Sequence, residues 1–301
     1  MLSSPNETSG GNIPDTATVI TNAIRAFAAA SPLNRMPMDR NDLIFGRPLV
    51  QFADGDDPIF NEYKEIIDPL HMTPREALAK VFDKEPEDLP DKLTVISWVL
   101  PVSEKTRKVN REETRTPSRL WSHQRWFGEI FNDALRDYVV EFLTEKGHLA
   151  TAPMKTTYFQ IKANDRGHFS NWSERHIAYA AGLGTFSLSD GFITESGIAH
   201  RCGSVVTDLE VTPSPRTASG PYANCLHYTN EKCGVCIQRC PAGAISEAGH
   251  DKIKCGRYLR DIGYRPDAMK GGYDLEKSMA GCGLCQTKVP CEAVNPTRKL
   301  K

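Results

Sequence analysis

Residues 225–241 read CLHYTNEKCGVCIQRCP, and this stretch decides how the last third of the chain folds. Its cysteines are spaced as Cys225-x7-Cys233-x2-Cys236-x3-Cys240-Pro241. Four more follow as Cys255 and then Cys282-x2-Cys285-x5-Cys291. All nine cysteines of the 301 residues lie between positions 202 and 291, so the sequence concentrates its thiols in one region.

The spacing C-x2-C-x3-C-P is the end of the C-x2-C-x2-C-x3-C-P motif of bacterial ferredoxins with two [4Fe–4S] clusters. The first cysteine of that motif would fall at Asn230, so we expect Cys225 to replace it. In the motif the last cysteine binds the other cluster, because a short C-x2-C loop presents two sulfurs to one cluster while the cysteine before proline points away. We therefore predict one site from Cys225, Cys233, Cys236 and Cys291, and a second from Cys240, Cys255, Cys282 and Cys285.

Two alternatives remain open for the cysteines. Pairs of C-x2-C also build structural zinc sites with four thiolates. Cys202 is left over, and it is either a small buried residue or a spare ligand in place of Cys225. Residues 201–301 carry 15 Lys and Arg against 10 Asp and Glu, a net charge of +5. This positive excess suits two four-thiolate clusters, each of which keeps negative charge.

The composition bounds the class of protein. Lys plus Arg is 37 and Asp plus Glu is 38, so the net charge is −1 and does not favour a nucleic-acid partner. We expect no membrane span, because no stretch approaches about 18 apolar residues. The N-terminus lacks the features of a secretion signal, so we expect a cytoplasmic protein, in which dense cysteine indicates metal binding rather than disulfides. The length predicts two domains.

The pattern along the chain predicts several elements. Residues 1–16 are expected to be a flexible leader, and residues 104–125 a solvated basic loop or a docking patch for an anionic cofactor tail or a reductase. The predicted helices are 18–31, two short ones within 56–85 (the second opening at Thr73-Pro74), a long one from Thr116-Pro117 to Lys146, and one capped by Asn171 with Glu174 and ending at Gly182. The predicted strands are a buried one at 92–100, strand material within 149–161, and two short strands within 191–209.

Residues 174–210 read ERHIAYAAGLGTFSLSDGFITESGIAHRCGSVVTDLE. This segment resembles the E-R-x-x-A-x-x-A-G-L-G segment, the hairpin and the T-D-L/I ending of epoxyqueuosine reductases and reductive dehalogenases. In both families two [4Fe–4S] clusters follow it. The resemblance covers residues 170–295, and the strand LTVISWVLP at 93–101 extends it weakly to about residue 90.

The resemblance implies an α/β (α+β) fold. Residues 17–215 would form a nitroreductase-like domain that binds a corrinoid and the substrate, and residues 216–301 a ferredoxin-like domain with two [4Fe–4S] clusters. It also implies a base-off cobalamin, reduced by the nearer cluster, which reduces a small organic substrate. An external donor such as a ferredoxin or flavodoxin would supply the electrons. We expect this chain to lack the C-terminal helical repeat domain of the tRNA-reducing enzymes, because the sequence ends ten residues after Cys291.

The resemblance also implies binding residues. Gly182 and Gly184 would let the backbone approach the corrin ring, and Arg175 would contact a cofactor amide or phosphate. The hairpin at 191–206 would line the pocket, with the predicted contacts Ile193, Thr194, Ser204 and Val205.

The sequence departs from the family at the proton donor. Epoxyqueuosine reductases carry an Asp six residues before the Glu of the E-R pair, and here that position is His168. A histidine donates protons near neutral pH, and Asp165 or Tyr158 are the alternatives. Two other functions therefore stay open: an electron-transfer protein or corrinoid-reducing activator without substrate chemistry, and a tRNA epoxyqueuosine reductase.

Overall fold

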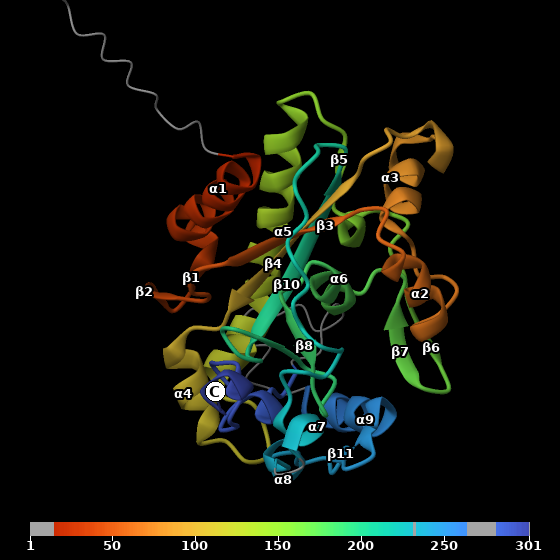
Figure 1. Ribbon diagram of the computed structural model, residues 1–301. Coiled ribbons are helices and arrows are strands. Elements are labelled where there is room, and N and C mark those ends of the chain that lie inside the picture. Colours follow the sequence, from red (N-terminus) through yellow and green to blue (C-terminus); the bar gives the residue numbers. More distant parts are fainter. Residues whose placement is uncertain (1–14, 231–232, 264–280, 301) are drawn as a thin grey trace, which may run out of the picture.

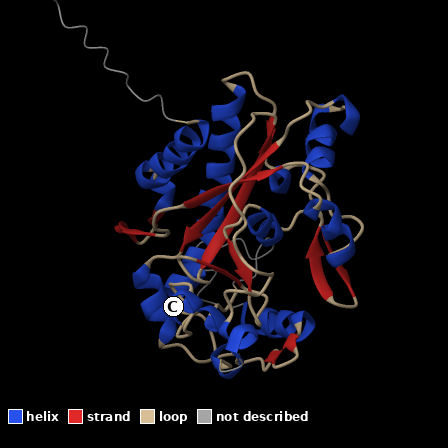
Figure 2. Ribbon diagram, in the orientation of Figure 1, coloured by secondary structure: helices blue, strands red, loops and turns tan. Residues whose placement is uncertain are grey.

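The computed structural model describes residues 15–230, 233–263 and 281–300. Within these ranges the fold is a mixed α/β arrangement with small antiparallel sheets, as Figure 2 shows. The largest sheet has four strands, and all neighbouring pairs are antiparallel. Its order is β3 (Leu49–Asp54), β4 (Thr94–Pro101), β10 (His200–Thr207) and β5 (Ala150–Thr151).

The central strand β4 is buried on both faces, as the run of apolar and β-branched residues predicted. Ile96 and Trp98 pack into a core shared with helices α1 (Thr16–Ala30) and α5 (Arg119–Thr144). Val95 points to the opposite face and packs into a second core. Figure 1 shows α1 and α5 on one side of the sheet and α6 (Glu174–Ala180) on the other.

The second core lies under three helices. They are α2 (Ile59–Ile66), α3 (Pro74–Phe82) and α6 (Glu174–Ala180). Helix α3 begins at Thr73-Pro74 as predicted, with Pro74 in the first turn. The structure adds a capping box between Thr73 and Glu76. The structure thus confirms the helix predicted at 18–31, the two within 56–85, the long helix and the two strands within 191–209. The expected hairpin at 191–206 is wrong, because β9 (Phe192–Thr194) pairs with β8 (Gly184–Phe186) and β10 pairs with β4 and β5.

Two sequence predictions are wrong in detail. Residues 104–125 are not a loop throughout, because they contain helix α4 (Glu104–Arg111). The long helix begins at Arg119, later than predicted, because the Ser118 side chain caps it by accepting a hydrogen bond from the Trp121 backbone N–H. The strand material expected within 149–161 is confirmed by β5 and by the first residue of β6 (Ile161–Asn164), with a 3-10 turn between them.

The predicted cap of α6 is also wrong, because its two side chains are used elsewhere. The Asn171 side chain accepts a hydrogen bond from the Gln160 backbone N–H and donates one to the Tyr158 carbonyl. Glu174 is instead part of a buried ion pair with Arg136. Long-range contacts of this kind are invisible to a local capping pattern.

The remaining elements of the described chain lie on either side of residue 215. Before residue 215 they are η1 (Pro32–Asn34), β1 (Arg35–Met36), β2 (Asp39–Leu43), η2 (Pro86–Asp88), η3 (Pro153–Lys155), β6 (Ile161–Asn164), β7 (Gly167–Ser170), β8 (Gly184–Phe186) and β9 (Phe192–Thr194). After residue 215 they are α7 (Leu226–Asn230), α8 (Val235–Gln238), β11 (Ile245–Ser246), β12 (Gly249–His250), α9 (Lys252–Gly263), η4 (Leu284–Gln286) and η5 (Pro296–Leu300).

The cysteine-rich elements gather at one end of the molecule, at the bottom of Figure 1. Backbone hydrogen bonds join this end to the sheet region: Ile198 N–H donates to the Cys291 carbonyl at 2.8 Å and Ala199 N–H to the Glu292 carbonyl at 3.3 Å. The predicted leader lies almost wholly outside the described residues, and α1 begins at Thr16. The division into domains 17–215 and 216–301 stays a prediction.

Candidate metal centre and the adjoining cavity

The first predicted thiol group comes together around a small apolar cavity. Cys225, Cys233, Cys236 and Cys291 all line it, and Cys285 of the second group also reaches it. Burial raises the pKa of Cys291, and the thiolates of Cys225, Cys236 and Cys233 raise it further. Since like charges act over short distances, these four sulfurs lie close to one another.

The second predicted thiol group also comes together. Burial raises the pKa of Cys255 to about 11, with Cys282 and Cys240 as the next causes. Burial likewise raises the pKa of Cys285 well above its ordinary value, followed by Cys282, Cys255 and Cys240. The position of Cys240 beside Cys255 is the arrangement that the C-x3-C-P spacing predicts.

The thiols are chemically suited to bind metal. All nine cysteines lie in the described part of the chain, and all are free of disulfides. Thiols with raised pKa values stay protonated at neutral pH until a cation displaces the proton, so metal binding and proton release are coupled. Within residues 15–230, 233–263 and 281–300, no three His, Cys, Asp or Glu side chains are grouped so as to hold a single metal ion. Metal binding itself stays a prediction.

Arg239 fixes the geometry of this end, although no sequence pattern singled it out. Its guanidinium donates to the Leu284 and Thr287 carbonyls at 3.3 and 3.1 Å, which ties α8 to η4. It also donates to the Glu113 carbonyl at 2.9 Å, beyond the end of α4. Its position directly before Cys240 in the motif is the one signal that could have pointed to it.

Glu292 anchors the last cysteine to helix α4. Its carboxylate, 5% exposed, binds Arg107 at 3.1 Å and Arg111 at 2.7 Å and accepts the Lys288 backbone N–H at 2.7 Å. Burial alone would raise the pKa of Glu292, but the hydrogen bonds from Arg111 and Lys288 lower it overall. Two of the basic residues in the stretch 104–125 therefore have a structural partner.

A large cavity of about 1060 Å³ lies between the sheet region and the thiol groups. Its wall includes Gly281 and Gly283, which flank Cys282 of the second group. Small-molecule sites usually have volumes of about 300–1,000 Å³, so this cavity has room for a large ligand. The sequence alone did not locate it, because its wall combines α2, α5, α6, β7, β10 and the segment after residue 281.

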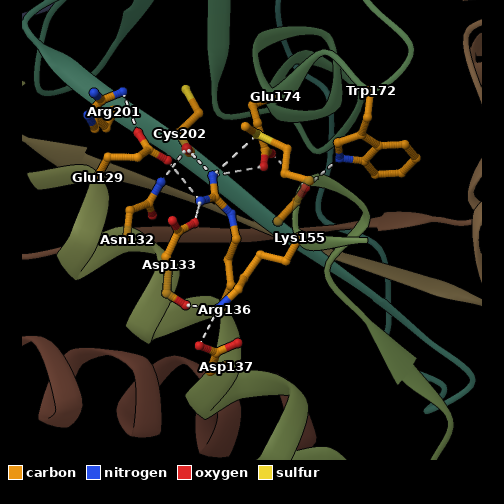
Figure 3. Close-up of polar contacts among 12 residues, drawn as sticks. Glu129, Asn132, Asp133, Arg136, Asp137, Lys155, Trp172, Glu174, Arg201 and Cys202 are labelled. Carbon is orange, nitrogen blue, oxygen red and sulfur yellow. Dashed lines mark hydrogen bonds and ion pairs between the residues drawn. The ribbon is translucent and has the colours of Figure 1, made fainter. Parts of the chain in front are cut away.

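One wall of the cavity is a buried charge network centred on Arg136, which is 1% exposed (Figure 3). Arg136 binds Glu129 at 2.9 Å, Asp133 at 2.7 Å and Glu174 at 3.1 Å. Glu174 also accepts a hydrogen bond from Ser204 at 2.6 Å. Burial raises the pKa of Glu174, which Arg136 and Ser204 partly oppose. The network joins helices α5 and α6 to strand β10.

Of the three candidate proton donors, the cavity wall includes His168. His168 lies on β7, which pairs with β6 in a two-stranded hairpin. Asp165 is exposed in the turn of that hairpin, and Tyr158 is 45% exposed before it. The role of each as a donor stays a prediction.

Arg175 lines the cavity, whereas the other predicted corrinoid contacts pack against the chain itself. At Gly182, with φ +79°, an added Cβ would lie 2.8 Å from the Pro215 carbonyl oxygen, so glycine serves the helix end there. At Gly184 it would lie 2.2 Å from the Ile193 carbonyl oxygen. The remaining predicted contacts are at most 1% exposed: Ile193, Thr194, Ser204 and Val205. Their placement does not fit contact with a corrinoid in this cavity.

Cys202 lines the cavity on strand β10, apart from both thiol groups. Burial raises its pKa to about 12, and the charges that act on it are those of Glu174, Arg175, Arg201 and Arg136. Its sulfur lies 3.7 Å from His200 Nδ1, and His200 Nε2 lies 2.6 Å from the Phe192 carbonyl oxygen. These surroundings do not support Cys202 as a substitute for Cys225.

Comparison with solved structures gives a likeness to a reductase. No protein-family model matches the chain, and no curated protein matches its sequence. A solved structure of epoxyqueuosine reductase from Bacillus subtilis, with its catalytic loop swung out of the active site, is similar at 15% identity and a TM-score of 0.43. The match covers 81% of this chain and 61% of that chain. A likeness at this level does not define a function, so the function proposed for this chain rests on its own residues.

In the part of the chain that the structure describes, no helix combines the length and the apolar character that a bilayer span requires.

Proposed function

We propose that this chain is an iron–sulfur oxidoreductase that holds two [4Fe–4S] clusters and reduces a small organic molecule in the large cavity. One observation carries the proposal: the second thiol group adjoins the cavity, since Gly281 and Gly283 on either side of Cys282 form part of its wall. A redox centre at this wall would border a ligand bound in the cavity. We further propose a cytoplasmic location, where thiols stay reduced.

Clusters of this type supply single electrons when bound, and the protein sets their surroundings. The eight cysteines would provide the thiolate ligands in the two groups described above. Burial raises the pKa of Cys282, and the nearby Arg239 guanidinium opposes this shift by favouring the thiolate. His168, in the cavity wall, would donate the proton that a reduction consumes.

The resemblance adds a base-off cobalamin to this proposal. The cavity volume supports a large cofactor, whereas the predicted backbone contacts at Gly182 and Gly184 do not. We therefore assign no reaction step to a corrinoid. The proposed partners are the small-molecule substrate and an external donor such as a ferredoxin or flavodoxin.

The first test is metal analysis and EPR on anaerobically reconstituted protein with Co(II) cobalamin added. We expect about eight iron atoms per chain for two [4Fe–4S] clusters. Zinc in place of iron would contradict the iron–sulfur proposal. A base-off Co(II) signal with the protein would support the corrinoid. Free base-on cobalamin beside reduced clusters would contradict the corrinoid and favour the electron-transfer alternative, unless the reduced protein turns over a small organic substrate.

A gel shift with tRNA, repeated over a salt titration, tests the third function. A tRNA-binding protein would lose affinity steeply as salt rises, because phosphate contacts release counterions. With a net charge of −1 we expect no shift, and specific binding at physiological salt would favour a tRNA epoxyqueuosine reductase.

A further inference from the structure

Three arginines from three different elements meet at the wall of the large cavity. Arg125 comes from α5, Arg175 from α6 and Arg201 from β10. They lie close together, because the charges of Arg201, Glu129 and Arg175 all shift the pKa of Arg125. The first 200 residues carry a net charge of −6. A cluster of positive charge in this region of net negative charge is therefore not explained by its composition.

Two of these arginines are already held by the protein. Arg201 binds Glu129 at 2.6 Å and donates to the Arg125 carbonyl oxygen at 2.7 Å. Its Nε atom is buried and has no hydrogen-bond partner among the described residues. Arg175 donates to the carbonyl oxygen of Asp190.

Arg125 is different, because its side chain makes no hydrogen bond or ion pair with any residue that the structure describes. Glu129, one turn further along α5, cannot serve it fully: one carboxylate oxygen binds Arg201 and the other binds Arg136. Repulsion from Arg201, followed by burial, lowers the pKa of Arg125 to about 9. Among the described residues, no carboxylate therefore pairs with Arg125.

We propose that Arg125 and Arg201 bind an oxyanion, a carboxylate or a phosphate group, of the small molecule that occupies the cavity. A guanidinium presents its N–H donors in a planar fork that matches both groups, and the side chain of Arg125 together with the unpartnered Nε of Arg201 offers such donors from the described part of the chain. An anion there would also relieve the repulsion between the two arginines.

Arg125 also borders the second thiol group, because a Cβ added at Gly281, next to Cys282, would lie 3.4 Å from its Nε atom. The charges that act on Arg125 all belong to the cavity wall, and the cation that acts on Cys282 is Arg239. That the anion belongs to a substrate rests on the proposed function, but anion binding itself is measured without turnover. A failure of anion binding is thus distinguishable from a failure of the proposed reductase function.

The experiment is isothermal titration calorimetry of the anaerobically reconstituted protein in a chloride-free buffer. The probes are sodium benzoate for a carboxylate and inorganic phosphate for a phosphate group. The variants are Arg125→Gln, which removes the charge, and Arg125→Lys, which keeps the charge without the fork. Arg166→Gln is the matched control, because Arg166 also lines the cavity but donates to the Ile66 and Ile67 carbonyls.

We expect Arg125→Gln to weaken binding of the preferred probe about tenfold or more, Arg125→Lys to weaken it less, and Arg166→Gln to change it less than about twofold. The preferred probe identifies the class of anion. Far-UV circular dichroism and the cluster absorbance check that each variant is folded and loaded. Equal affinity of wild type and Arg125→Gln, equal weakening by Arg166→Gln, or binding of neither probe to the wild type would overturn the proposal.

Discussion

At the scale of single residues, Cys240 is the most informative of the cysteines, because it stands four positions after Cys236 yet lies with Cys255 and Cys282. Proximity along the chain would have put it in the first group. The ferredoxin motif instead predicts that Cys240 belongs to the second group, and the fold places the Cys240 thiol beside the thiols of that group. Whether these thiols bind a cluster together stays a prediction.

Replacing Cys240 by Ser should remove one cluster and spare the other. We expect iron to fall from about eight to about four atoms per chain, since a serine seldom replaces a thiolate ligand. Iron analysis and EPR of the reduced protein measure this. Cys202→Ser is the control, because Cys202 lies apart from both groups, and it should keep all the iron. The two-group arrangement would be contradicted if Cys202→Ser lost iron, or if Cys240→Ser kept all of its iron.

At the scale of elements, the regular parts of the fold were predictable from sequence and the connections between them were not. Helix α3 has its full capping box within four residues, so local pattern suffices. Helix α4 was expected to be a loop, because its basic residues suggest a solvated surface. Arg107 and Arg111 gain a shared buried partner only in Glu292, which is more than 180 residues away in the sequence.

Substituting Glu292 by Ala should therefore destabilise the protein. It would leave Arg107 and Arg111 without their shared carboxylate, and breaking a buried pair of this kind costs about 3 kcal/mol. Urea denaturation of the reconstituted protein measures the loss.

The control for this substitution is Glu104→Ala on the same helix. Glu104 pairs with Lys108 at 2.8 Å, but both side chains are largely exposed. Exposed pairs contribute little to stability, so we expect no measurable shift of the urea midpoint. If both variants lost the same stability, the anchoring role of Glu292 would be refuted.

At the scale of the whole molecule, buried histidines should make stability depend on pH. Burial lowers the pKa of His71, His123 and His200 to about 4 and that of His176 to about 3. The unfolded chain takes up these protons below about pH 6.5 while the folded protein does not. Their contribution to stability is therefore fully present above about pH 6.5 and falls as the pH drops towards about 4.

Each such histidine contributes a slope of about 1 kcal/mol per pH unit near about pH 5. Urea midpoints at about pH 7, 6 and 5 measure the total slope. In His71→Gln we expect this slope of stability against pH to fall by about that amount. The contributions of all other groups cancel when the slope of the variant is subtracted from the slope of the parent. An unchanged slope in His71→Gln would show that His71 is protonated in the folded protein.

The sequence by itself determined the local and the chemically specific features of this protein. These are the buried strand β4, the positions of most helices, and the spacing that divides eight cysteines into two groups. The strand and the helices depend on residues that are neighbours in the chain. The grouping of the cysteines depends on the spacing that binding to a [4Fe–4S] cluster requires.

Only the tertiary structure decided where charge and space meet. The cavity wall, the Arg136 network, the position of Arg125 and the Glu292 anchor all join residues that are far apart in the sequence. A buried charge is stable only beside a partner, and which partner it finds depends on how the helices and the sheet pack. For that reason no local pattern predicts these contacts, and they are the ones that define the proposed site.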